Sequence, residues 1–161
     1  MNNKHKLPLL AGPAALALAC AGLAGGSSYA AGTHVQGFEA KVVPVQGSAT
    51  LRVTQETGSI HQAEGIAHGT LGGTLHLTVD IETASRMKAS FTDRLHGGTL
   101  SGSGSAKYTI SGTVLHFVGT TGVSGGTGAY AHASGSGIRI EGSLDRLKKT
   151  LTMTIHGSMK V

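Results

Sequence analysis

The amino-acid sequence predicts an all-β fold in which about eight antiparallel strands close into a barrel. Nearly every segment after Gln46 alternates apolar and polar side chains with a period of two, which is typical of strands with one buried and one solvated face. Short runs rich in Gly, Ser and Thr separate these segments at distances suited to turns. No segment has the periodicity of an amphipathic helix, which argues against helical fold classes.

The first thirty residues are interpreted as a signal peptide that export removes. Lys4 and Lys6 give a positively charged start, and residues 7–23 form an apolar, alanine-rich stretch. Small residues then lead to Ala30, where a signal peptidase would cut. The sequence therefore predicts a secreted or periplasmic protein whose mature chain begins near residue 31.

Two alternatives to this cleavage involve the membrane. A permanent anchor is disfavoured by Gly12 and Pro13, because a spanning helix needs about 20 strongly apolar residues. A lipid anchor would use Cys20, the only cysteine, since the four residues that end there resemble a lipobox. Ala17 stands where that motif usually has a larger aliphatic residue. In either case the folded part has no disulfide and no thiolate ligand.

The mature chain has the length of one domain. We expect residues 31–46 to be a lead-in and residues 47–161 to form the barrel. Two of the 13 Lys and Arg residues lie in the leader, which leaves a mature net charge of +3. The basic residues are scattered apart from a turn-like cluster at Arg146, Lys148 and Lys149, so no nucleic-acid partner is expected.

Four segments show the alternation most clearly, and their apolar residues should all point to one face. A closed barrel leaves no free strand edge, and glycines inside strands favour its curvature over the alternative, a two-layer sandwich. The expected turns are residues 56–59, 83–85, 96–98 and 111–112. The expected inward residues are Leu75, Leu77, Val79 and Ile81; Met87, Ala89 and Phe91; Ile138 and Ile140; and Leu151, Met153 and Ile155.

Residues 113–118 differ from the other strands because both faces carry apolar side chains. We therefore expect cover on both sides, from a partner copy or from a flanking segment. One face carries Leu115 and Phe117, and the other carries Val114, His116 and Val118.

A glycine-dense stretch, residues 125–130 (GGTGAY), lies between this strand and another at residues 138–141. Glycine adopts positive φ and allows close backbone approach, so the stretch predicts a bulge or sharp corner in a curling sheet. Residues 126–131 also fit a dinucleotide fingerprint, and residues 122–126 fit the G-x-S-x-G nucleophile motif. Both motifs need a following helix, which the Gly/Ser-rich residues 133–137 cannot form.

The remaining candidates for catalytic or metal-binding residues are histidines and carboxylates. Eight histidines lie outside the leader, and none forms an H-x-H or HExxH pattern. His116 and His132 are the pocket candidates because their neighbours are apolar or aromatic, whereas His76 and His156 should be solvated. Without a convergent ligand set the sequence predicts no metal and no cofactor. Asp80 and Glu82 share the polar face of one strand. We expect no carboxylate to face the barrel interior.

Residues 119–131, followed by the small residues 133–137, resemble the glycine-rich signature of allene oxide cyclase-like and dirigent-like barrel proteins. In that superfamily the signature marks the turn between two late barrel strands. Ser134 is a departure, because the family often has a simpler Ala-x-Gly there. The resemblance implies a small antiparallel barrel with an apolar cavity, often a dimer or trimer. Its plant members cyclise a fatty-acid epoxide or direct phenoxy-radical coupling, but the residues that carry those activities are not matched here.

The function expected is therefore the binding of a small hydrophobic ligand inside an exported barrel. The residues expected to line its pocket are Phe91, Tyr108, His116 and Phe117. Two alternatives stay open. One is a cyclase or isomerase acting on an oxidised lipid or terpenoid, with His116 or His132 as its polar group; the other is a non-catalytic surface or structural module.

Overall fold

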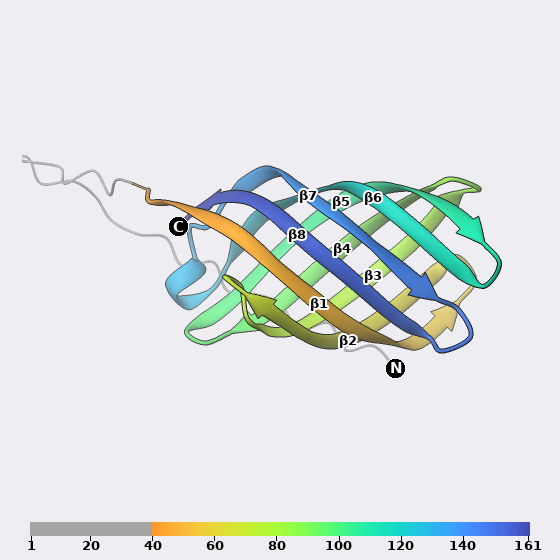
Figure 1. Cartoon of the computed structure of the whole chain (residues 1–161). Coiled ribbons are helices and arrows are strands. Elements are labelled where there is room, and N and C mark those ends of the chain that lie inside the picture. The colour runs from red at the N-terminus through yellow and green to blue at the C-terminus, as the bar shows by residue number, and fades with distance from the viewer. Residues whose placement is uncertain (1–39) are drawn as a thin grey trace, which may run out of the picture. The chain divides into compact units, whose positions relative to one another are not determined.

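Eight antiparallel strands form a closed barrel in the computed structural model, which describes residues 40–161 (Figure 1). The leader, its cleavage site and Cys20 lie outside the described residues. The elements are β1 (Val42–Thr57), β2 (Ile60–Gly69), β3 (Gly73–Thr83), β4 (Arg86–Leu95), β5 (Gly98–Ser111), β6 (Val114–Gly126), the 3-10 turn η1 (Gly128–Tyr130), β7 (Gly135–Asp145) and β8 (Thr150–Lys160).

Each strand pairs with its neighbours in the chain, and β1 pairs with β8 to complete the ring. This confirms the barrel and excludes the sandwich. The four expected turns are also confirmed: residues 96–98 lie where β4 joins β5, and the other three lie where β1 joins β2, β3 joins β4 and β5 joins β6. We call the end that carries the β1–β2, β3–β4, β5–β6 and β7–β8 turns the turn end. The opposite end, with the β2–β3, β4–β5 and β6–β7 connections and the C-terminus, is the terminal end (Figure 1).

The first strand begins at Val42, before the expected start of the barrel at residue 47. Val42 to Gln46 pair with β8, from Lys160 to His156, while pairing with β2 starts only at Gly47. Pro44 is therefore accommodated in a stretch with one strand partner, where its missing N–H breaks no ladder on the β2 side. This part of the strand was not predicted from the sequence, because it contains a proline and its alternation is irregular.

The glycine-dense stretch forms the corner that the sequence predicted. β6 runs on to Gly126, η1 follows, and β7 starts at Gly135. Pairing registers shift nearby, between Ser101 and Gly102 against β6 and between Thr121 and Val123 against β7. The G-x-S-x-G residues lie on strand β6, so the nucleophile motif has no structural basis here.

Alternation places the expected apolar residues inside the barrel. Within the described chain, the buried ones form two clusters, a larger one that includes Leu51 and Phe117 and a smaller one around Leu100 and Ile138. On the outer face, Val118 is 52 % exposed, so no flanking segment of the described chain covers it. Cover by a partner copy stays a prediction.

Two interior phenylalanines lie against glycines of the neighbouring strand. Phe91 is paired with Gly102, and Phe117 with Gly142. A Cβ at Gly102 would lie 2.7 Å from Phe91 Cε1, and one at Gly142 would lie 2.6 Å from Phe117 Cζ. Each ring thus fills the space left by a missing side chain, an arrangement that stabilises curved sheets.

We expect Gly142→Ala to destabilise the barrel by about 1–3 kcal/mol, because the new methyl would overlap Phe117 and the Thr152 carbonyl oxygen. Gly72→Ala is the matched control, since the nearest atoms would lie 3.8 Å from its Cβ. Urea unfolding of both variants measures the difference. Equal stability of the two variants would contradict the close packing described here.

Candidate functional site

The barrel interior contains two cavities, one toward each end. The larger, toward the turn end, has a volume of about 280 Å³, and the smaller, toward the terminal end, about 60 Å³. The cavities lie back to back, because five residues at the middle of the barrel line both of them: Leu77, Ala89, Gly104, Ile140 and Met153.

The larger cavity has an almost entirely apolar lining. Its space comes from small inward residues on neighbouring strands, among them Ala63 on β2 and Gly104 and Ala106 on β5. Tyr108 also faces it, but its hydroxyl donates a hydrogen bond to the Thr83 carbonyl at 2.8 Å. The phenol is thus held at the turn end, and its apolar ring contributes to the wall of the cavity.

Ionisable groups are confined to the rim of the larger cavity. Glu56 and His61 are directly paired on β1 and β2, with Glu56 Oε1 3.7 Å from His61 Nδ1. Lys149 Nζ lies 2.9 Å from Glu56 Oε2, and this hydrogen bond is the main reason that the pKa of Glu56 is lowered. Arg146 also lines the rim and donates to the Gly112 carbonyl at 2.9 Å. The rim is therefore charged, whereas the interior is not.

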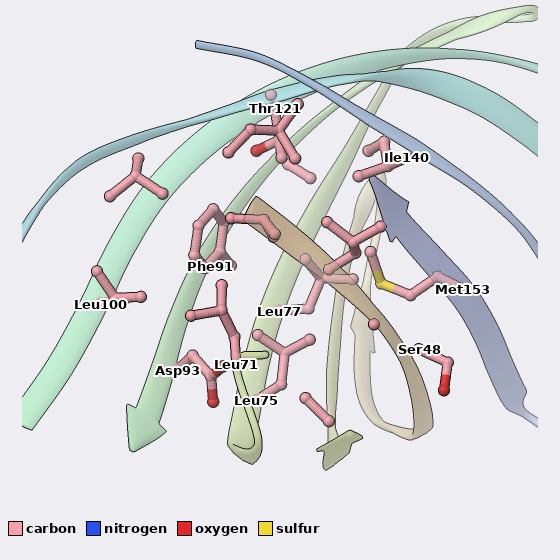
Figure 2. Close-up of a pocket in the computed structure, with 18 of the residues that line it drawn as sticks. Ser48, Leu71, Leu75, Leu77, Phe91, Asp93, Leu100, Thr121, Ile140 and Met153 are labelled. Atoms are coloured by element: carbon pink, nitrogen blue, oxygen red, sulfur yellow. The ribbon is translucent and has the colours of Figure 1, made fainter. Parts of the chain in front are cut away.

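The smaller cavity holds a carboxylate. Figure 2 shows Asp93 at its edge, close to Leu71 and Leu75, with Phe91 and Leu100 nearby. Asp93 is 4 % exposed and is the one buried charged residue of the described chain. Its Oδ1 has no hydrogen-bond partner in the barrel.

Burial shifts the acidity of Asp93. Desolvation disfavours the ionised form and raises the pKa of its carboxyl to about 6. No cation offsets this, since the ion pairs among the described residues all involve other carboxylates. At neutral pH the barrel therefore carries an uncompensated interior charge.

Three of the four expected pocket residues face a cavity: Phe91 the smaller one, and Tyr108 and Phe117 the larger one. The expectation for His116 is wrong, because Leu115 and Phe117 point inward and alternation turns His116 to solvent. His132 is likewise exposed, in the β6–β7 connection.

Sequence reasoning missed Asp93 and the rim pair. Asp93 could have been found, because it continues the inward series of Met87, Ala89 and Phe91 by one more step of two. The orientation of Glu56 had no such signal. A register shift between Val53 and Gln55 reverses the alternation and brings Glu56 opposite the inward-facing His61.

Comparison with protein-family models, with curated proteins and with solved structures found no match. Residues 40–161 contain no group of three or more His, Cys, Asp or Glu residues placed to hold a metal ion. No helix of this described part is long and apolar enough to cross a membrane.

The buried carboxylate predicts a pH-dependent stability. The pKa of Asp93 rises from an ordinary 3.8 to about 6 on folding, so the folded state binds more protons between these values. The unfolding free energy should therefore fall as pH rises through this window, with the full penalty present above about pH 6. At about 1.4 kcal/mol per pKa unit, the loss is on the order of 3 kcal/mol.

Urea unfolding of the wild type and Asp93→Asn at pH 4 and pH 7.5 measures this loss. The variant should gain stability relative to the wild type between the two pH values, because only the wild type becomes charged inside. The other carboxylates contribute equally to both proteins. Parallel pH profiles would show that Asp93 does not carry the penalty.

Proposed function

We propose that the barrel binds a small hydrophobic ligand in its larger cavity. The supporting observation is a largely apolar space of about 280 Å³ inside the barrel, the larger of its two cavities. Pockets for small molecules usually measure about 300–1,000 Å³ and are lined mainly by hydrophobic side chains. This cavity is at the lower limit of that range, which favours a compact ligand.

The position of the polar groups favours a particular orientation of that ligand. The apolar body would lie among Val79, Met87 and Phe117, and any polar substituent would lie at the rim beside His61 and Arg146. A polar group placed deeper would lose its hydration, and the Tyr108 hydroxyl could not donate to it because its proton is already bonded to the Thr83 carbonyl.

Naphthalene is a suitable neutral probe because it is compact and wholly apolar. With methyl-labelled methionine, NMR distinguishes the two ends, since Met87 lines the larger cavity and Met159 packs in the cluster at the terminal end. We expect naphthalene to shift the Met87 signal and to leave Met159 almost unchanged.

Ala63→Leu should weaken this binding at least tenfold, because the added side chain would occupy the larger cavity. Ala67→Leu is the matched control, since Ala67 faces inward on the same strand but lines only the smaller cavity. Absence of binding to the wild type, or equal loss in both variants, would contradict the proposal and would favour the structural-module alternative.

A second candidate function is a cyclase or isomerase acting on an oxidised lipid or terpenoid. One observation favours it: His61 lines the cavity with a carboxylate 3.7 Å from its Nδ1, and such a pair can exchange protons with a bound substrate. His61→Gln would separate the two functions. Loss of turnover with retained naphthalene binding would support an enzyme.

Export and assembly are proposed together with this function. We infer that the mature protein is secreted or periplasmic, and that it is a dimer or trimer whose contact covers Val118. Native mass spectrometry of the protein purified from its own host should give a mature chain beginning near residue 31. A lipidated chain beginning at Cys20 or a monomer would contradict the respective inference.

A further inference from the structure

No residue of the described barrel forms an ion pair with the carboxylate of Asp93. It lies inside the barrel in register with Leu75 on β3 and Leu100 on β5, and both neighbours are apolar. Its Oδ1 accepts no hydrogen bond, and no Lys, Arg or His among the described residues forms an ion pair with it. A buried carboxylate in this condition destabilises the fold unless something else supplies a positive charge or a donor.

The carboxylate of Asp93 packs closely against the start of β3. Because Gly73 has no side chain, Asp93 Oδ1 fits there, 2.7 Å from where a Cβ would lie. Beside it is the smaller cavity of about 60 Å³, whose remaining wall is mostly aliphatic and aromatic (Figure 2). At about 15 Å³ per water-sized group, this is room for about four non-hydrogen atoms.

We propose that Asp93 and the smaller cavity form a second binding site, which takes a small primary ammonium ion at the terminal end of the barrel. The ammonium would donate a charge-assisted hydrogen bond to Oδ1, which is buried and has no other partner. A short alkyl chain would lie against Leu71 and Phe91. This site does not depend on the ligand of the larger cavity.

An ammonium ligand fits better than a neutral alcohol or an acid. An alcohol would satisfy the hydrogen bond but leave the negative charge uncompensated, and an anion would be repelled by it. The other ionisable residue of the lining, His68, is exposed on β2. Inside the cavity the charge that selects the ligand is therefore that of Asp93.

The probe is n-propylammonium, which has four non-hydrogen atoms, and its controls are n-propanol and sodium chloride at equal concentration. Carboxyl ¹³C NMR follows the titration of Asp93 directly, and the signal is assigned by its absence from Asp93→Asn. We expect n-propylammonium to lower the pH midpoint of Asp93 and to bind at least tenfold more weakly below that midpoint. The signal of Asp80, which is exposed on the outer face, should not change.

Two variants complete the test. Asp93→Asn should weaken n-propylammonium binding at least tenfold, measured by the methyl signals around the smaller cavity, and Ala67→Leu should block it by filling the space. Ala63→Leu, which alters only the larger cavity, should leave it unchanged. An unshifted Asp93 signal, an equal effect of n-propanol, or unaltered binding to Asp93→Asn would overturn the proposal. None of these results would bear on the binding of naphthalene in the larger cavity.

Discussion

The structure depends on the closed ring of backbone hydrogen bonds, which is completed where β1 pairs with β8. Each of the eight strands has a partner on both sides, so the described barrel has no edge strand with a free row of N–H and C=O groups. A ring of this size can close only if its strands tilt and curve. That curvature requires small residues at defined points of the wall, and it fixes which side chains share the limited interior.

The interior is filled unevenly as a result. Where a large ring faces a glycine, as with Phe117 and Gly142, the space is fully used and the wall can bend. Where β5 presents Gly104 and Ala106 inward in succession, the opposite side chains do not reach far enough to close the gap. The cavity at the turn end thus comes from small inward residues of the strands themselves. A space of this origin needs no loop to form it.

Electrostatics distinguish the two ends of the barrel. At the turn end Glu56 has both Lys149 and His61 beside it, and solvent screens the group. At the terminal end Asp93 lies in an apolar wall without an ion-pair partner, and its burial raises the pKa of the carboxyl. An uncompensated charge beside an empty space lowers stability, and the proposed ammonium ligand would offset it. The ligands proposed for the two cavities therefore differ in chemistry, one neutral and apolar and the other cationic.

The fold class, the strand alternation, the turns and the corner after β6 could all be predicted from the sequence, because they follow from the period-two pattern and from local glycine chemistry. The sequence also placed Phe91, Tyr108 and Phe117 inside. Where space remains depends on the tertiary fold, since a cavity depends on which residues from several strands meet at one level. The place of Glu56 at the rim of the larger cavity also depends on it, because a one-residue register shift against β2 reverses the side-chain direction and pairs Glu56 with His61.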